Sequence, residues 1–272
     1  MKKITKNNIS YYVFEHIQQT GLCTHCFTTR QGGVSAGCYA ALNMSLHRDD
    51  DPAAIRANYG LVCDTLGFKL DNIVVADQYH TNNIYIATMA DCGHDFFKSR
   101  KLAHVDGLIT AERGPTLLTY YADCVPLLFL DKALGVIANV HSGWRGVVNN
   151  IAAAAVGRMI SGFGSRPADI LVGIGPHIGQ AAFEVMDDVA DEFTSKLDFA
   201  HEFITKRGKF HVDLCGVITR CLTDIGIPPD NIEASNVCTF ENESEFFSHR
   251  RDGLQRGGMA LIATLKEQNE NY

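Results

Sequence analysis

Long apolar stretches are missing from this chain of 272 residues. The apolar segment nearest the first residue, Tyr11 to Phe14, is short and is followed by the charged Glu15. A membrane-spanning helix needs roughly 20 apolar residues, and a secretion signal needs an uninterrupted apolar core. We therefore expect no transmembrane helix, no secretion signal and no membrane partner.

An excess of positive charge is missing as well, because the formal net charge is −7. Proteins that bind nucleic acids usually present a basic surface, so we expect no nucleic-acid partner. The nine cysteines are an odd number and follow no framework spacing. Together with the missing secretion signal, they predict reduced thiols and a cytoplasmic protein.

Several cofactor motifs are also absent. The chain contains neither the dinucleotide-binding G-x-G-x-x-G nor the P-loop G-x-x-x-x-G-K-[ST]. Cys23 and Cys26 form a C-x-x-C, but no second such pair supplies the remaining ligands of a structural zinc site. Because both cysteines lie in an apolar segment that resembles a strand, we expect them to be core residues.

What the chain does contain is an irregular alternation of predicted strands and helices. Asp51 followed by Pro52 predicts the start of a helix that ends near Gly67, and Asp213 predicts another helix start. The alanine-rich segment 147–159 predicts a helix. Short apolar runs predict strands, among them 9–17, 22–29, 72–76, 84–87, 169–174, 209–213, 232–239 and 259–264. Without repeats or linkers, this pattern favours a mixed sheet over a regular doubly wound one.

The richest chemistry lies between Thr119 and Met159. Two apolar runs flank a polar turn, and a hairpin that turns at Lys132-Ala133 would place Cys124 directly opposite His141. Directly opposed residues have Cβ atoms about 5 Å apart, so the two side chains could hold one metal ion or share a proton. A cysteine in an apolar run is more often a buried hydrophobe, but the facing histidine and the polar cluster at the turn favour a site.

His80 adds a third side chain to this pair. It lies in a polar cluster between two predicted strands. Two histidines and one cysteine, with an open fourth position, are the pattern of a catalytic zinc site. Asp123, beside Cys124, is either a carboxylate that orients an imidazole or a structural hydrogen-bond partner.

Seven motifs occur in an order and spacing that identify a family. They are 27–33 (FTTRQGG), 78–80 (QYH), 106–110 (DGLIT), 122–128 (ADCVPLL), 141–146 (HSGWRG), 175–179 (GPHIG) and 246–253 (FFSHRRDG). Over residues 25–264 the chain resembles the laccase-domain family, also called the YfiH or polyphenol oxidase family. Members of that family are described as purine nucleoside phosphorylases with adenosine deaminase activity.

The resemblance implies one α/β domain over residues 1–272, with mixed β-sheets and helices packed on the outside. It implies a zinc ion held by His80, Cys124 and His141. These three residues and Asp123 are the candidate catalytic residues. The resemblance also implies purine nucleosides and phosphate as partners, through phosphorolysis of adenosine, inosine, guanosine and methylthioadenosine and through deamination of adenosine.

Three arginines are candidate contacts of phosphate or ribose. Arg145 lies where a helix is expected to open, and backbone N–H groups at a helix start attract anions. Arg30 precedes a Gly-Gly turn that is either an anion-binding loop or a plain turn. Arg250 lies in the last of the seven motifs.

Two positions depart from the family pattern. Tyr79 stands where valine is usual, so we expect an altered pocket wall. Near the end, the family usually has Thr-Gly-Arg, whereas this chain has Arg256-Gly257-Gly258. Arg256 would have to replace that arginine if it contacts a ligand.

Three alternative functions are open. Cys124 and His141 could be a metal-free dyad of an amide hydrolase that edits cell-wall precursors, provided that a third group orients the histidine. A copper-dependent polyphenol oxidase would need several histidine-rich clusters, and eleven scattered histidines without an H-x-H pair argue against copper. A non-catalytic zinc-binding protein would need a fourth protein ligand.

Overall fold

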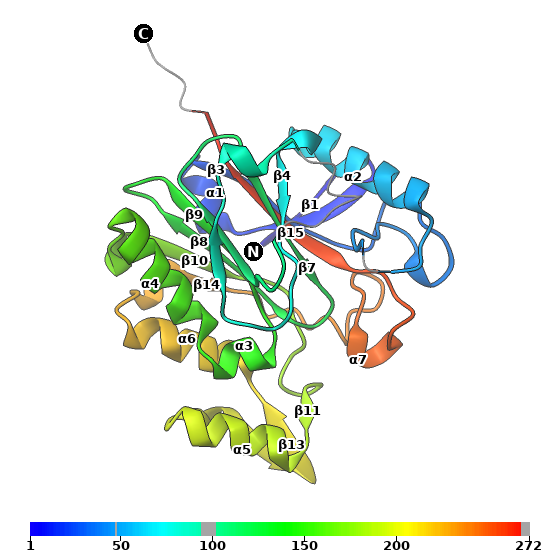
Figure 1. The fold of residues 1–272 in the computed structure, drawn as a ribbon. Helices are drawn as coiled ribbons and strands as arrows, with labels where there is room; N and C mark the ends of the chain where they lie inside the picture. The colour runs from blue at the N-terminus through cyan, green and yellow to red at the C-terminus, as the bar shows by residue number, and fades with distance from the viewer. Residues whose placement is uncertain (47, 94–101, 268–272) are drawn as a thin grey trace.

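Two six-stranded sheets pack face to face in this protein (Figure 1). The structure is a computed structural model that describes residues 1–46, 48–93 and 102–267. The first sheet has the order β1 (Lys2–Lys6), β2 (Ile9–Val13), β3 (Cys23–Thr28), β15 (Met259–Leu265), β7 (Thr116–Tyr121) and β4 (Ile73–Val75). The second has the order β14 (Ile232–Ala234), β10 (Ile170–Ile174), β8 (Val125–Asp131), β9 (Val136–Ser142), β6 (Gly107–Thr110) and β5 (Ile84–Ile86). Each sheet combines parallel and antiparallel pairs, which confirms the predicted mixed sheets.

Helices cover the outer faces of both sheets. α2 (Pro52–Leu66) lies against the first sheet, and Figure 1 shows α3 (Trp144–Val148), α4 (Ile151–Phe163) and α6 (Leu214–Asp224) on the opposite side. A small sheet of β11 (Glu184–Val185), β13 (Lys209–Val212) and β12 (Ile204–Arg207) lies with α5 (Asp187–Lys196) beyond the helices of the second sheet. The remaining helices are α1 (Glu15–Gln19) and α7 (His249–Asp252). Within the described residues, no helix is both long and apolar enough to cross a membrane.

Alternate residues of the second sheet build two separate cores. Leu128 and Leu130 of β8 pack between the sheets, against β15 residues such as Leu261. Leu127 and Phe129 of the same strand face the helices. Both faces of the strand are therefore buried, which explains its continuous apolar sequence. A third core joins the outer face of the first sheet to α2.

The starts of helices were predicted correctly where a side chain caps the helix. Asp51 accepts a hydrogen bond from the Ala53 N–H at the start of α2, and Asp213 accepts one from Gly216 at the start of α6. The segment 147–159 was predicted to form one helix, but the structure divides it between α3 and α4. Asn150 adopts a positive φ of 53° between α3 and α4, and its side chain caps the second helix. Asparagine tolerates this conformation better than most residues.

Two predicted strands were too long. The segment 9–17 leaves the first sheet after Val13 and forms α1, whose first N–H groups, from Glu15 and His16, donate to the Glu233 carboxylate. The Glu233 carboxylate lies more than 200 residues away in the sequence, and its negative charge stabilises the start of α1. The predicted strand 232–239 ends at Ala234.

The register of the central hairpin also differs from the prediction. Its turn contains four residues, 132–135, closed by Gly135 at a φ of 66° and by the Asp131 carboxylate, which accepts from the Ala133 and Leu134 N–H groups. His141 consequently pairs with Pro126 rather than with Cys124. The shift of two residues preserves the face on which the side chains lie.

Candidate metal centre and substrate pocket

Cys124 lies where the chain crosses from the first sheet to the second. β7 ends at Tyr121 and β8 begins at Val125, so three residues make the crossing. Asp123 takes a φ of 88° there, and its buried carboxylate accepts hydrogen bonds from Thr239 Oγ1 (2.7 Å), Ser248 Oγ (3.0 Å) and the Arg250 N–H (2.7 Å). These bonds hold the crossing against the C-terminal part of the chain. A catalytic role for Asp123 stays a prediction.

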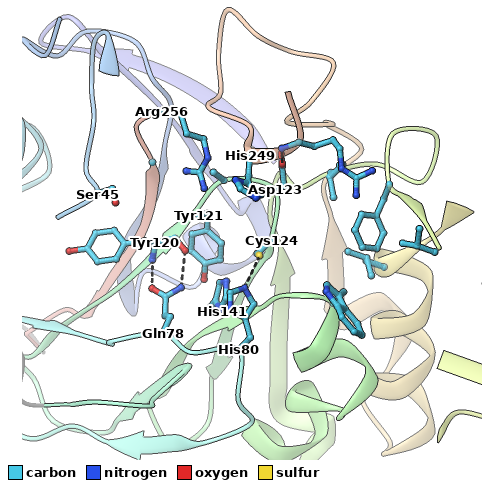
Figure 2. Close-up of a pocket in the computed structure, with 18 of the residues that line it drawn as sticks. Ser45, Gln78, His80, Tyr120, Tyr121, Asp123, Cys124, His141, His249 and Arg256 are labelled. Atoms are coloured by element: carbon cyan, nitrogen blue, oxygen red, sulfur yellow. Dashed lines mark hydrogen bonds between the residues drawn. The ribbon is translucent and has the colours of Figure 1, made fainter. Parts of the chain in front are cut away.

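The structure brings His80, Cys124 and His141 together. One ligand atom from each lies within 4.8 Å of the other two, and His80 Nε2 is 3.7 Å from Cys124 Sγ. His141 comes from the end of β9 and is 4% exposed, whereas His80 comes from the β4–β5 connection and is exposed. In Figure 2 the three side chains converge below Asp123. The cluster could therefore bind a metal ion, with its open side toward the pocket.

Asp106 organises this cluster from behind. Its carboxylate lies 2.8 Å from His141 Nδ1 and accepts hydrogen bonds from the N–H groups of Tyr79, His80 and Thr81. It is fully buried just before β6, and its carbonyl accepts from the His141 N–H. One aspartate thus fixes both the His141 ring and the loop that carries His80. A carboxylate on the far nitrogen of a histidine is a frequent partner of metal-binding imidazoles.

The charges of these groups support one another. Burial alone would raise the pKa of the Cys124 thiol, but His141 and His80 outweigh it and lower that pKa to about 6. Burial alone would lower the pKa of His141, but the Cys124 thiolate and Asp106 raise it to about 9. Burial opposes ionisation of Asp106, yet the bonds from His141 and Thr81 lower its pKa to about 2. The site therefore favours a thiolate, which is the form that binds a metal or attacks a substrate.

Gly143 leaves the room that the His80 ring occupies. A Cβ atom at this position would lie 2.3 Å from His80 Cδ2, 3.0 Å from His80 Nε2 and 3.3 Å from Cys124 Sγ. Contacts below about 3 Å between such atoms cannot persist, so the ring would have to move.

We expect Gly143→Ala to lower metal affinity by about tenfold or more, because a displaced ligand costs at least as much as a lost outer partner. Titration with zinc in a competing chelator measures the effect. Gly157→Ala is the matched control, since a Cβ on that exposed helix position meets no atom within 4 Å. Unchanged affinity in Gly143→Ala would contradict the close packing of His80.

A pocket of about 660 Å³ opens in front of the cluster. This volume suits a small organic ligand. One wall is apolar, built by Trp144, Ile178, Phe183, Val185, Met186, Val189 and Leu214. The other end is polar and carries Ser45, Arg48, Gln78, His249 and Arg256. The pocket can therefore hold a ligand with one flat apolar part and one polar or anionic part.

The three arginines predicted to contact substrate lie in different places. Arg250 lines the pocket, but its guanidinium donates to the carbonyls of Ala182 and Glu184. Arg30 lies in a separate surface hollow formed with 241–244, and donates to the carbonyls of Ala40 and Glu243. Arg145 is exposed and stacks on Trp144 with its Cζ 4.2 Å from the ring centre. Among the three, only Arg250 is part of the pocket lining.

Several site residues were missed from the sequence. Asp106 was noted only as part of a motif, although its position directly before a buried strand was a usable signal. Gln78 lines the pocket and forms two hydrogen bonds with the backbone of Tyr120, so it ties the His80 loop to β7. Arg48 lies in a loop without any motif. Tyr79 is 55% exposed, packs on His104 and is not among the pocket-lining residues, so the structure gives no support to an altered pocket wall.

The fold and the cluster together define an α/β protein with a three-ligand centre in a substrate-sized pocket. Residues 24–266 match the family described as multi-copper polyphenol oxidoreductase laccase. A purine nucleoside phosphorylase of Bacteroides thetaiotaomicron is 34% identical over 90% of this chain and 92% of its own length. The purine nucleoside phosphorylase YlmD of Bacillus subtilis is 34% identical over 89% of this chain and 88% of its own.

Solved structures agree with this similarity. The hypothetical protein YfiH of Bacillus licheniformis superposes with a TM-score of 0.88 at 34% identity, covering 96% of this chain and 97% of that one. YlmD from Geobacillus stearothermophilus gives a TM-score of 0.82 at 32% identity, covering 90% and 92%. The chain belongs to the laccase-domain family, as its motifs predicted. Within the described residues, one group of side chains could hold a metal ion, whereas multicopper chemistry uses several histidine-rich centres.

Proposed function

We propose that this protein is a zinc-dependent purine nucleoside phosphorylase that also deaminates adenosine. Adenosine, inosine, guanosine and methylthioadenosine are the proposed nucleoside substrates, phosphate is the co-substrate, and the cytoplasm is the proposed location. The proposal rests chiefly on one observation, namely that His80, Cys124 and His141 converge at the wall of a pocket with one apolar and one cationic end. The similarity to relatives named purine nucleoside phosphorylase supports it.

The donor atoms fit a zinc ion. One thiolate and two imidazoles suit zinc, and His141 keeps Nε2 for the ion because Asp106 occupies Nδ1. The proton that His141 gains in the metal-free protein would leave when the metal binds. A zinc ion held there would supply a Lewis acid beside the substrate.

The chain's own residues would bind and orient the reactants. The apolar wall that includes Trp144 and Phe183 offers a surface for the purine ring and excludes water from it. Phosphorolysis then forms a bond between a phosphate oxygen and C1′ of the ribose, while the C1′–N9 bond breaks and the purine leaves with a proton. Deamination instead adds water at C6 of adenine and releases ammonia.

Product analysis tests the proposal directly. We expect purified protein of known metal content to convert adenosine to adenine and ribose 1-phosphate only when phosphate is present. Inosine should form in either buffer, and both activities should disappear after metal removal and return with zinc. Chromatography of the products measures each. If zinc-loaded protein releases neither base nor inosine, the proposed function is wrong for adenosine.

A second candidate function has a specific observation in its favour. Cys124, His141 and Asp106 form a chain of thiol, imidazole and orienting carboxylate, which is the arrangement of a cysteine nucleophile. The structure thus provides the third group that an amide hydrolase needs. Such an enzyme, acting on cell-wall precursors, would retain activity on amides after metal removal, whereas the phosphorylase would not.

A further inference from the structure

Two arginines at the polar end of the pocket form no ion pair within 4 Å in the part of the chain that the structure describes, although Asp123 and Asp252 act on Arg256 from farther away. Arg256 is 8% exposed, and its guanidinium donates to the Gly257 carbonyl at 2.8 Å. Within the described ranges, the one hydrogen bond seen for Arg48 is a long one of 3.4 Å, donated to the Leu254 carbonyl. Among the described residues, neither forms an ion pair, and the Nε of each is buried without a hydrogen-bond partner. Buried polar atoms without a partner are costly, and a bound ion or ligand is one explanation for them.

The two arginines are held side by side by their loops. The Met44 N–H donates to the Gly258 carbonyl, and the Gly258 N–H donates to the Asn43 side chain, so the loop that carries Arg48 is fixed against the segment that carries Arg256. The charges are close enough to influence each other. Burial and then Arg48 lower the pKa of Arg256 to about 10, although Asp123, Cys124 and Asp252 act in the opposite direction. Nearby positive charges in one pocket are expensive unless an anion lies between them.

Both arginines face the same pocket as the metal cluster. Arg48, Arg256, Ser45 and Cys124 all line it, and Figure 2 shows Arg256 directed into the pocket that His80 and Cys124 border. Gly258 lines the same end, where a Cβ would lie 3.0 Å from the Ser45 Cβ and 3.4 Å from the Tyr121 carbonyl oxygen. The absence of a side chain at Gly258 therefore lets this part of the lining pack closely against Ser45 and the end of β7.

We propose that Arg48 and Arg256 form the binding site of a phosphoryl anion within this pocket. Guanidinium groups bind phosphate through paired hydrogen bonds, and two of them can neutralise a dianion. Under the proposed function, on which the identity of the ligand rests, the anion is the inorganic phosphate that attacks C1′. The same chemistry could come from the 5′-phosphate of a nucleotide. The arginines predicted from motifs, Arg30, Arg145 and Arg250, are then not the principal phosphate ligands.

Phosphate binding can be measured without any turnover. We expect inorganic phosphate, titrated calorimetrically into zinc-loaded protein, to bind at least tenfold more weakly to Arg256→Gln and to Arg48→Gln than to the wild type. Arg158→Gln is the matched control, because Arg158 is exposed on α4 and does not line the pocket. Arg48 is only half-buried, so Arg48→Gln keeps the test available if the Arg256 variant does not fold.

Two further measurements distinguish inorganic phosphate from a nucleotide as the source of the anion. An inorganic source predicts a raised KM for phosphate in phosphorolysis with a nearly unchanged KM for adenosine. A nucleotide source predicts that adenosine 5′-monophosphate binds the wild type more tightly than adenosine, and that both variants lose this preference. Affinities for phosphate and for the nucleotide within twofold of wild type in both variants would overturn the anion site.

The same data distinguish this inference from the proposed function. Arginine-dependent phosphate binding without any phosphorolysis would leave the anion site standing and remove the phosphorylase. Normal phosphorolysis with an unchanged KM for phosphate in both variants would leave the phosphorylase function standing and remove the anion site at Arg48 and Arg256.

Discussion

Replacement of Cys124 by alanine is expected to abolish both proposed activities and to leave the protein with far less than one zinc per chain. Cys124 supplies the single anionic ligand of the cluster, since the other two donors are imidazoles. Loss of an outer partner already costs roughly 10–100-fold in metal affinity or activity, so loss of a direct ligand should exceed that range. Elemental analysis and steady-state kinetics of the variant measure both effects.

The control for this experiment is Cys38→Ala. Cys38 is also a free cysteine, but it is exposed and lies outside the pocket. We expect this variant to keep wild-type metal content and kcat/KM. A Cys124 variant with normal zinc content and normal phosphorolysis would show that the reaction takes place elsewhere.

Asp106→Asn is expected to lower metal affinity and kcat together by roughly 10–100-fold. The carboxylate accepts from three successive backbone N–H groups and contacts His141 Nδ1, whereas asparagine offers one oxygen and places an NH₂ group among those donors. His141 would lose its orientation and the His80 loop would lose its anchor. The unpaired buried donors should also destabilise the fold by about 1–3 kcal/mol.

Metal affinity separates this positioning role from a general loss of stability. Asp131→Ala is the comparison variant, because Asp131 is equally buried but its Oδ1 caps the turn at the far end of β8, and alanine removes both of those bonds. We expect it to lower the free energy of unfolding while zinc affinity stays at the wild-type value. If both variants lose stability and neither loses zinc affinity, Asp106 acts only as a structural residue.

Much of the local structure was available from the sequence. Asp51-Pro52 and Asp213 are self-contained signals, because each cap bonds to an N–H group within three residues. The three candidate metal ligands could also be selected, since cysteine and histidine are uncommon residues that lie at the ends of apolar runs. Cysteine and histidine could be selected as metal ligands by residue type alone. An error of two positions in the strand register does not matter, because it leaves each side chain on the same face of the sheet.

The other site residues could not be selected from the sequence, because they depend on segments that meet only in the folded chain. Aspartate and arginine are common and mostly solvated. The position of Asp106 before a buried strand was a weak local signal, and nothing local distinguishes Arg48 from Arg30. Their partners lie far away in sequence, at His141 for Asp106 and beside Arg256 for Arg48. The sequence by itself determined which residues could bind a metal and where most elements run. The tertiary structure decided which carboxylate orients the imidazole and which arginines share the pocket, because burial and long-range packing remove water from those groups and leave them only each other or a ligand as partners.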